Sequence, residues 1–238
     1  MSAWEEVQIG DCRLILGDCR EVLPTLPMVD AVIVDPPYSK RCHEGHDSAG
    51  AQDGPRSDLG YSHLTHQDIT ILAAHYAQIC NGWIAWMTDS DLALFVRQSL
   101  ESVDRYAFAP LPFYQPGRSV RLSGDGPCSW TDYIIVARTP GGYVAGPGWN
   151  DKARMGGKPT HLMRALVSDY SRPGDMVLDS HMGAGTTGVA CAIEGRRFIG
   201  IEIDRAAFDI ACERIDNAYR QAPLLPILPV KQIQEALI

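Results

Sequence analysis

A predicted buried strand ends at a carboxylate, a proline corner and an aromatic ring. Residues 31–34, Ala-Val-Ile-Val, are followed by Asp35, Pro36, Pro37 and Tyr38. Proline has no N–H to donate to a sheet, so the strand cannot continue through this corner. The carboxylate can accept hydrogen bonds from an N–H donor, and the ring can stack on a flat group. The corner is therefore the first candidate for a reactive site.

A glycine-rich loop provides a second candidate site. Gly183, Gly185 and Gly188 form a G-x-G-x-x-G pattern between a predicted strand ending at Asp179 and a predicted helix. Such glycines permit a tight turn and let a ligand approach the backbone at a helix N-terminus. Glu202 ends the next predicted strand, where a carboxylate can accept hydrogen bonds from both hydroxyls of a ribose. The pair indicates an adenosine-type cofactor; an ordinary glycine-rich turn is the alternative.

The position of this loop distinguishes between NAD and S-adenosylmethionine, which both fit it. A nicotinamide-binding fold begins with its glycine loop and uses the following strands for the second nucleotide. Here the loop starts at Gly183 and only one obvious strand follows it. The order favours S-adenosylmethionine and leaves an NAD-dependent oxidoreductase as the weaker alternative. The chain has no G-K-[ST] sequence, which excludes a P-loop.

The elements that must position these residues alternate between strand and helix along the chain. This alternation predicts an α/β fold whose mostly parallel sheet carries helices on both faces. Gly82 is expected to end the second helix. The predicted strands are 13–16, 30–34, 83–88, 106–114, 133–137, 176–178 and 197–201, and the predicted helices are 19–25, 65–80, 90–102, 160–170, one between the last two strands, and 205–219.

Four acidic residues stand at the ends of predicted strands. They are Asp18, Asp35, Asp179 and Glu202. In a parallel sheet the carboxyl ends of the strands meet at one edge, and ligands bind beyond that edge. We therefore expect the four carboxylates to surround a common site. Thr65 and Asp68 form a capping-box pattern, which predicts where the second helix begins.

Composition restricts the class of protein. The 238 residues are 45% hydrophobic, enough for a substantial core. Neither a signal segment nor a membrane span is predicted, and the seven irregularly spaced cysteines argue against a disulfide framework, so the cytoplasm is the expected location. The net charge is −8, yet residues 105–173 hold nine Lys and Arg against four Asp and Glu. This basic segment is either a phosphate-binding face or ordinary charge scatter.

The Asp-Pro-Pro-Tyr corner, the glycine loop and Glu202 together resemble the amino-group DNA methyltransferases, which methylate adenine N6 or cytosine N4. The catalytic motif precedes the cofactor loop, as in their β class. The resemblance implies a Rossmann-like S-adenosylmethionine-dependent methyltransferase fold: α/β, with a seven-stranded mostly parallel sheet, helices on both faces and circularly permuted. It implies a single methyltransferase domain over residues 1–238, a mobile loop over 39–62 and a small target-recognition region over 115–157.

The same resemblance assigns the cofactor site. Asp18 resembles the acid that contacts the adenine ring, and Lys158 with Pro159 resembles the motif beside the methionine end. Residues 195–204, GRRFIGIEID, match the family's second strand. The implied cofactor is S-adenosyl-L-methionine, with S-adenosyl-L-homocysteine as product. The implied cofactor-binding residues are Asp18, Cys19, Asp35, Lys158, Pro159, Thr160, Asp179, His181, Met182, Gly183, Ala184, Gly185, Thr186, Thr187, Glu202 and Ile203.

Three departures from the family pattern stand out. Asp179-Ser180-His181 replaces the usual Asp-Pro-Phe, so an imidazole stands where an aromatic ring is expected over the cofactor. Residues 156–159, Gly-Gly-Lys-Pro, replace Thr-x-Lys-Pro, and a Trp-x-Lys signature is not evident. None of these changes removes a group that the chemistry needs.

The catalytic roles implied by the resemblance fall on the first corner. The Asp35 side chain and the Pro36 carbonyl accept the two N–H bonds of the target amino group, Pro37 keeps the corner rigid, and Tyr38 stacks on a base flipped out of the duplex. Asp at position 35 favours adenine N6, with cytosine N4 as the alternative. An RNA substrate and a non-catalytic homologue that binds DNA or cofactor are further alternatives.

The implied partners are double-stranded DNA and a second copy of the chain, in a bacterial cell or encoded by a phage. No metal is expected, although Cys42, His43 and His46 could hold one; a polar loop explains them better. The expected DNA contacts are Ser39, Lys40, Arg41, Arg118, Arg121, Lys152 and Arg154.

Overall fold

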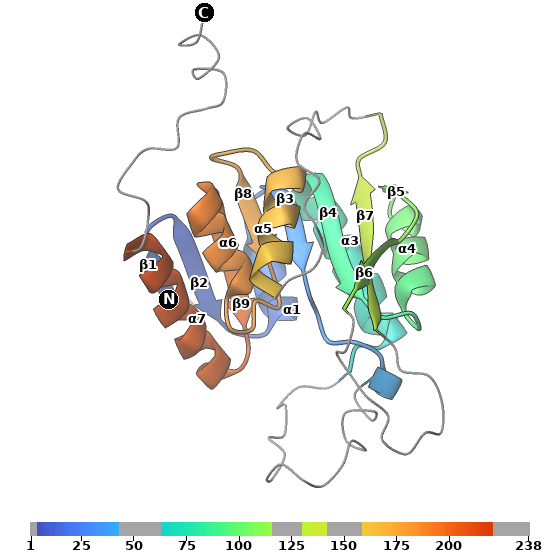
Figure 1. Ribbon diagram of the computed structural model, residues 1–238. Helices are drawn as coiled ribbons and strands as arrows, with labels where there is room; N and C mark the ends of the chain where they lie inside the picture. Colours follow the sequence, from blue (N-terminus) through green and yellow to red (C-terminus); the bar gives the residue numbers. More distant parts are fainter. Residues whose placement is uncertain (1–3, 43–62, 116–129, 142–158, 221–238) are drawn as a thin grey trace, which may run out of the picture.

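The computed structural model describes residues 4–42, 63–115, 130–141 and 159–220. These residues form one mixed sheet in the order β1-β2-β9-β8-β3-β4-β7-β5, with β6 also paired to β7 (Figure 1). The strands are β1 Glu5–Ile9, β2 Cys12–Leu16, β3 Val29–Val34, β4 Cys80–Thr88, β5 Tyr106–Ala107, β6 Leu111–Tyr114, β7 Thr131–Arg138, β8 Met176–Asp179 and β9 Arg197–Glu202.

The five central strands, β2, β9, β8, β3 and β4, pair in parallel, and every pairing outside them is antiparallel. Strand β3 precedes the Asp-Pro-Pro-Tyr corner and pairs with β8, which precedes the glycine loop. Two segments far apart in sequence therefore leave the sheet side by side. This placement agrees with the expectation that Asp35 and Asp179 share one edge of the sheet.

The described sheet has nine strands rather than the predicted seven. Strand β1 was not predicted, because Val7 and Ile9 alternate with polar residues over only five positions. It forms a hairpin with β2, with Ile9 opposite Cys12. The single strand predicted over 106–114 is two strands, β5 and β6. Pro110 lies between them and has no N–H to continue the pairing with β7.

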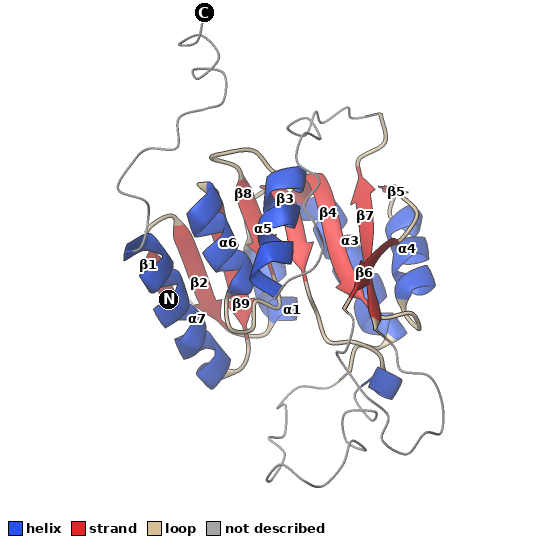
Figure 2. Cartoon of the chain, in the orientation of Figure 1, coloured by secondary structure: helices blue, strands red, loops and turns tan. Residues whose placement is uncertain are grey.

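The helices cover both faces of the sheet (Figure 2). Helices α5, α6 and α7 lie on one face, and α1, α3 and α4 lie on the other. Their bounds are α1 Cys19–Val22, continued by the 3-10 turn η1 Leu23–Thr25, then α3 His66–Ile79, α4 Ala93–Ser102, α5 Pro159–Tyr170, α6 Thr186–Glu194 and α7 Arg205–Arg220.

Strand β3 contributes to a separate apolar core on each face. Val32 and Val34 pack into the core under α3 and α4, while Ala31 and Ile33 pack into the core under α5, α6 and α7. All four are fully buried. Alternate side chains of a strand point to opposite faces, so a continuous apolar run is the expected sequence of such a central strand. Burying each Val or Ile stabilises the fold by about 1.5–3 kcal/mol.

Helix α3 lies within one residue of its predicted bounds at each end, but Gly82 does not end it. Thr65 Oγ1 accepts the N–H of Asp68 at 3.2 Å, and the Asp68 carboxylate accepts the Thr65 N–H at 3.1 Å, which completes the capping box. Gly82 was expected to end this helix, but α3 ends at Ile79 and Gly82 lies within β4. A Cβ there would collide with the carbonyl oxygen of Asp30, so glycine serves a close approach of two strands.

Two predicted regions fall largely outside the described residues. These are most of the loop over 39–62 and both flanks of the target-recognition region over 115–157. Within the latter range, β7 is an integral strand of the sheet. Among the described helices, none has the length and apolar character to cross a membrane.

Candidate active site

The four acidic residues predicted to share a site do leave the same edge of the sheet. Glu202 ends β9 opposite Leu16 of β2, and Asp18 follows that strand by two residues. Asp179 ends β8, and Asp35 comes directly after β3. Because β2, β9, β8 and β3 are parallel neighbours, their carboxyl ends place these groups in one row.

The three glycines of the loop have different physical roles. Gly183 has φ +50°, and no atom lies within 4 Å of where a Cβ would be, so its side faces open space. Gly185, with φ +76°, forms the N-cap of α6, and a Cβ there would meet Ala211 of α7 at 2.9 Å. A Cβ on Gly188 would collide with Ile215 and Phe198. Gly183 therefore leaves room for a ligand, and the other two allow close packing.

Glu202 is held by backbone N–H groups. Its Oε2 accepts the Gly183 N–H at 2.8 Å, and its Oε1 accepts those of Ile203 and Asp204 at 2.9 and 2.8 Å. A carboxylate has about four lone-pair sites, so three such bonds orient it and leave capacity on Oε2. This geometry is compatible with a ribose hydroxyl as a further donor.

Asp179 is buried between β8 and the start of α6. Its Oδ2 accepts the Thr187 hydroxyl at 2.6 Å, and its Oδ1 accepts the His181 N–H at 3.0 Å. Burial, with smaller contributions from the charges of Asp35 and Glu202, raises the pKa of Asp179 to about 7. A cationic group beside Asp179 would favour its ionised form. Asp35 and Glu202 thus act electrostatically on the same carboxyl group.

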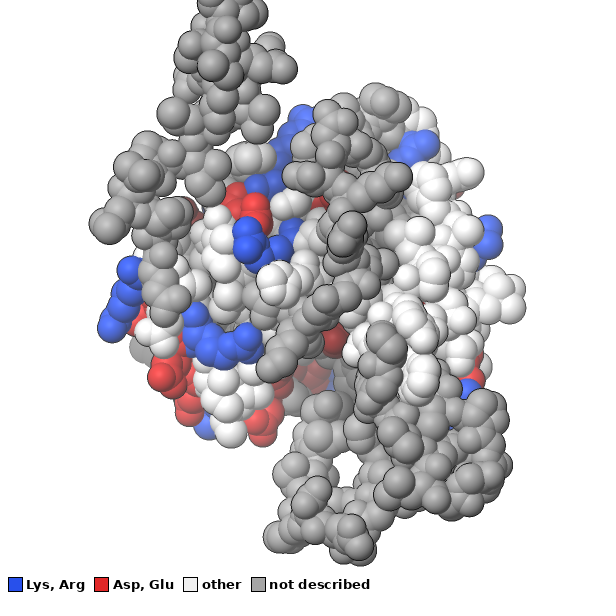
Figure 3. Space-filling model, in the orientation of Figure 1, with Lys and Arg blue, Asp and Glu red and all other residues white. Residues whose placement is uncertain are grey.

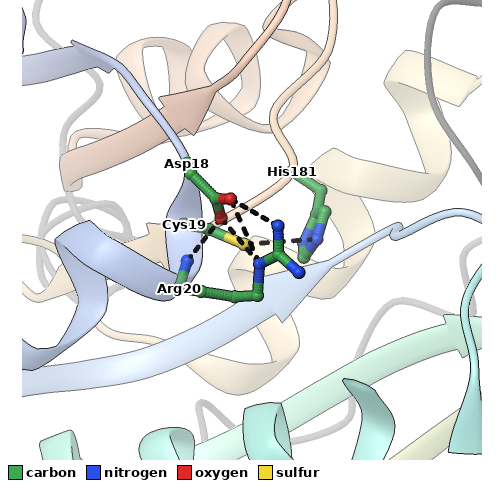
Figure 4. A network of polar contacts seen from close by, with 4 residues as sticks. All are labelled: Asp18, Cys19, Arg20 and His181. Carbon is green, nitrogen blue, oxygen red and sulfur yellow. Dashed lines mark hydrogen bonds and ion pairs between the residues drawn. The ribbon is translucent and has the colours of Figure 1, made fainter. Parts of the chain in front are cut away.

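Asp18, Arg20, Cys19 and His181 form a polar network at the mouth of the site (Figure 4). The Asp18 carboxylate caps α1 by accepting the Arg20 N–H at 2.9 Å, and the Arg20 guanidinium pairs with it at 2.5 Å. This contact lowers the pKa of Asp18. His181 Nε2 lies 3.6 Å from the Cys19 sulfur. At the pocket, the Asp18 carboxylate is therefore ionised and paired with the Arg20 guanidinium.

A chain of hydrogen bonds continues from His181 into the core. His181 Nδ1 lies 2.9 Å from Ser180 Oγ, which lies 2.5 Å from the hydroxyl of fully buried Tyr76. Burial lowers the pKa of His181 to about 4, so the imidazole is neutral at pH 7. Burial of Cys19 raises the pKa of that thiol to about 12. The Ser-His departure from the family pattern thus forms a neutral polar chain.

A pocket lies between these groups and the Asp-Pro-Pro-Tyr corner. Pro37 lines the same pocket as Asp18, His181 and Glu202. Ile203, 59% exposed, adds an apolar surface on the outer side. Its acidic, apolar and backbone groups are those that an adenosine moiety requires. The full lining is Gly17, Asp18, Cys19, Arg20, Pro37, His63, Leu64, Asp68, Leu72, Ser180, His181, Ile201, Glu202 and Ile203.

The corner itself presents Asp35 at the surface. The Asp35 side chain is exposed, Pro36 is buried, and Tyr38 is half-buried. The Tyr38 carbonyl accepts the Leu64 N–H at 3.2 Å. The buried strand β3 thus ends directly before an accessible carboxylate, and the two prolines that follow form the corner beside the pocket.

Three contacts near the site were not predicted. Asp89, after β4, accepts the Ser39 N–H at 2.9 Å. Arg214 of α7 donates to the Ala184 carbonyl at 2.5 Å in the glycine loop. Tyr76 begins the buried chain described above. Only Ser180 carried a signal in the sequence, as a polar residue where the family pattern has proline.

The predicted DNA contacts divide into two groups. Arg118, Arg121, Lys152 and Arg154 lie outside the described residues, as does the cofactor candidate Lys158; the helix α5 begins at Pro159 and Thr160. Lys40 and Arg41 are exposed, with Arg41 paired to Asp91 at 2.6 Å. Ser39 is 6% exposed, so its hydroxyl is not available to a partner. We therefore omit Ser39 from the proposed DNA contacts.

Two arginines of the basic segment have structural roles. Arg105 is buried and donates to the carbonyls of Ala77, Cys80 and Gly82, and Arg164 pairs with Glu194 at 2.7 Å. On the visible face in Figure 3, basic and acidic side chains are interspersed over the described surface. Among described residues, no group of three or more His, Cys, Asp and Glu is placed to hold a metal. His43 and His46 lie outside that part.

Known proteins share this sequence pattern. Residues 148–213 match the N6/N4-type DNA methylase family model. The type II methyltransferase M.Cfr9I of Citrobacter freundii is 44% identical over 59 residues, 25% of this chain and 20% of the relative. The DNA adenine methyltransferase YhdJ of Escherichia coli K12 is 41% identical over 61 residues, 26% of this chain and 21% of the relative. Each match therefore spans about a fifth of the relative's length.

Solved structures share the fold over most of the chain. The M1.HpyAVI–SAM complex has a TM-score of 0.67 and 22% identity, covering 86% of this chain and 99% of that chain. The cytosine-N4-specific PvuII DNA methyltransferase has a TM-score of 0.62 and 13% identity, covering 96% of this chain and 92% of that chain. The fold is thus the Rossmann-like fold of S-adenosylmethionine-dependent methyltransferases. The matched segment, residues 148–213, contains the glycine loop and is similar to the amino-group DNA methyltransferases.

Proposed function

We propose that this protein transfers a methyl group from S-adenosylmethionine to the exocyclic amino group of a base in DNA. The observation that carries the proposal is the placement of Pro37. It belongs to the Asp-Pro-Pro-Tyr corner and lines the pocket that also contains Glu202 and Asp18. A base whose amino group lies beside Asp35 would thus be next to the cofactor that supplies the methyl group. S-adenosylmethionine supplies the electrophilic methyl group, bound to its sulfonium sulfur.

The residues of the pocket would orient this cofactor through complementary chemistry. Glu202 has acceptor capacity for ribose, and Ile203 offers an apolar surface to a nucleobase. Asp179 would face a cationic part of the cofactor, whose charge favours the ionised carboxylate. Asp18 is assigned to the adenine edge. Lys158 and Pro159 are assigned to the methionine end by resemblance.

Asp35 and Pro36 would act on the target amino group. That nitrogen is a weak nucleophile, because its lone pair is delocalised into the base. When the Asp35 carboxylate and the Pro36 carbonyl accept hydrogen bonds from its two N–H groups, the nitrogen is drawn toward tetrahedral geometry. The lone pair would then point at the methyl group that S-adenosylmethionine supplies; its transfer would leave S-adenosylhomocysteine, and the surplus proton on the nitrogen would pass to solvent. Positioning and electrostatics supply most of the acceleration.

Tyr38 would hold the base in place during the transfer. A base inside a duplex cannot reach an enclosed site, so the target nucleotide must leave the stack. A half-buried ring next to the acceptor can stack on the extruded base. We assign duplex contacts to Lys40, Arg41 and the basic residues 118, 121, 152 and 154, with binding that weakens steeply as salt rises.

Adenine N6 is the methyl acceptor that we favour. Aspartate at position 35 supports adenine, and one matched relative is named as an adenine methyltransferase. Cytosine N4 is the alternative, because a solved structure of the same fold is cytosine-N4-specific. We also propose a homodimer, since the recognition region is small for a monomer reading a long site. Light scattering of the purified chain would test this assembly.

The test of the function is direct. Unmethylated DNA is incubated with the full chain and S-adenosylmethionine, and the digested nucleosides are identified by mass spectrometry. N6-methyladenine is expected; N4-methylcytosine would select the alternative base. DNA without either product, from protein shown to bind S-adenosylhomocysteine, would disprove the activity. Stabilisation by NAD instead of S-adenosylhomocysteine would favour an oxidoreductase.

A further inference from the structure

Asp89 joins the loop after β4 to the chain that leaves the Asp-Pro-Pro-Tyr corner. Its Oδ2 accepts the backbone N–H of Ser39 at 2.9 Å. Its Oδ1 accepts the N–H groups of Asp91 and Leu92, each at 3.1 Å, just before α4. Asp89 and Ser39 are 50 residues apart in sequence. One carboxylate therefore ties the two segments together.

The contact fixes the peptide group that follows Tyr38. The Ser39 N–H and the Tyr38 carbonyl belong to one peptide unit, which is planar. Asp89 accepts from its N–H, and the Leu64 N–H donates to its carbonyl at 3.2 Å. The Ser39 side chain is buried at 6% exposure. With both polar atoms bonded, the plane cannot rotate, so the backbone that carries the Tyr38 ring is held in one orientation.

We propose that Asp89 is a positioning residue that sets Tyr38 for stacking on the target base. The inference rests on the proposed function, because it gives Asp89 a role only where Tyr38 contacts a base. Asp89 does not line the cofactor pocket. Its effect is carried through the Tyr38–Ser39 peptide.

Asparagine at position 89 separates the link to Ser39 from the role of Asp89 in the turn before α4. An amide has one acceptor oxygen and one NH₂ donor. If the oxygen keeps the bonds from Asp91 and Leu92, the NH₂ faces the Ser39 N–H, and two donors oppose each other. Asp89→Asn therefore keeps the turn that leads into α4 and loses the link to Ser39. A buried N–H without an acceptor is costly, so the peptide of Tyr38 is released.

Asp91→Asn is the matched control. It removes one negative charge from the same loop, as Asp89→Asn does, and it weakens the exposed pair with Arg41, whose own charge stays available to DNA. Exposed pairs contribute little to stability. The Asp91 backbone N–H that bonds Asp89 is unchanged. Any general effect of charge on DNA approach would therefore appear equally in both variants.

The experiment measures methyl transfer from tritiated S-adenosylmethionine to unmethylated genomic DNA. We expect Asp89→Asn to lower kcat about tenfold, with the KM for S-adenosylmethionine and the melting temperature within error of Asp91→Asn. Asp91→Asn should stay within about twofold of the wild type. Equal kcat values for the two variants would overturn the inference. A wild type that methylates no DNA would overturn the proposed function itself.

A second measurement distinguishes positioning of Tyr38 from a general loss of folded protein. If Asp89 acts through Tyr38, adding Asp89→Asn to Tyr38→Ala should lower kcat by less than about twofold beyond Tyr38→Ala alone. A purely structural loss at Asp89 would instead multiply the two effects, and a tenfold further fall would contradict the inference. The cycle tests coupling between the two residues and not the stability of the loop.

Discussion

The Tyr76 hydroxyl oxygen lies 2.5 Å from Ser180 Oγ, although 104 residues separate the two in sequence. The ring of Tyr76 is fully buried and also contacts Trp86 edge to face. This bond connects α3 to the loop after β8, where Ser180 and His181 line the cofactor pocket. A residue of α3 thus holds in place the Ser180–His181 segment of the pocket lining.

Tyr76→Phe is expected to destabilise the fold by about 1 kcal/mol, because a buried hydroxyl pair is lost while the ring stays. Urea unfolding measures the change. Tyr114→Phe, at an exposed position, should alter the free energy of unfolding by less than about 0.5 kcal/mol. A cost at Tyr76 no larger than at Tyr114 would show that the short contact contributes nothing.

His181 should make the protein less stable in acid. Its folded pKa is about 4, below the usual value of 6.5, so the unfolded state binds the proton more readily between these values. Stability from this group is present above pH 6.5 and is lost as the pH falls toward 4. His181→Phe removes the penalty. Relative to the wild type, it should therefore gain stability at pH 4.5 compared with pH 7.5, measured by urea unfolding at both values.

Asp179 changes stability with pH in the opposite direction to His181. Its folded pKa of about 7 lies above the usual 3.8, so stability from Asp179 is present below pH 3.8 and lost as the pH rises through 7. The two groups partly cancel in the wild type. The free energy of unfolding of His181→Phe should therefore depend on pH differently from that of the wild type. If the two showed the same pH dependence, the pKa of His181 would not be lowered by burial in the folded protein.

Much of the fold followed from local patterns. The buried runs that end at Asp35, Asp179 and Glu202 identified the site, because a parallel sheet brings strand ends to one edge. Strand β1 was missed, because two glutamates begin it and only Val7 and Ile9 are apolar. Its pairing depends on the turn to β2, which a short alternation cannot reveal.

Other features depend on partners distant in sequence. Gly82 reads as a helix end, but its role is to let the Asp30 carbonyl approach β4. Asp89 looks like an ordinary acid before a helix, and only the folded chain brings Ser39 to it. Such contacts arise from tertiary packing, which neither spacing nor propensity encodes.

The glycines of the loop should respond differently to alanine. Gly183→Ala meets no atom within 4 Å but is strained at φ +50°, by about 1 kcal/mol, and its methyl group enters open space beside the Glu202 carboxylate that the Gly183 N–H contacts. Gly188→Ala collides with Ile215 and Phe198. We expect Gly183→Ala to fold and bind S-adenosylhomocysteine at least tenfold more weakly, and Gly188→Ala to lose about 1–3 kcal/mol of stability. Calorimetric titration and urea unfolding separate the two.

The reverse pattern would contradict the assignment of these glycines. If Gly183→Ala lost stability alone while ligand affinity stayed unchanged, the open side of Gly183 would not face a ligand. Val189→Ala is a suitable control, because Val189 is half-buried in the same helix and does not line the pocket.

Removing the Asp35 carboxylate should abolish turnover and also alter cofactor binding in a defined direction. Asp35→Asn leaves the amino group without its anionic acceptor, so methyl transfer should fall by at least 100-fold while S-adenosylmethionine still binds. The Asp35 charge raises the pKa of Asp179, so its loss should lower that pKa. Affinity for the cationic cofactor, which rises as Asp179 ionises, should then reach its midpoint at lower pH than in the wild type. Titration calorimetry from pH 5.5 to 8.5 measures that midpoint.

Asp30→Asn, at the opposite end of β3, is the control and should change neither the turnover nor the pH of this midpoint. Near-normal turnover of Asp35→Asn would remove Asp35 from catalysis, and an unmoved midpoint would place Asp179 away from the cofactor's charge.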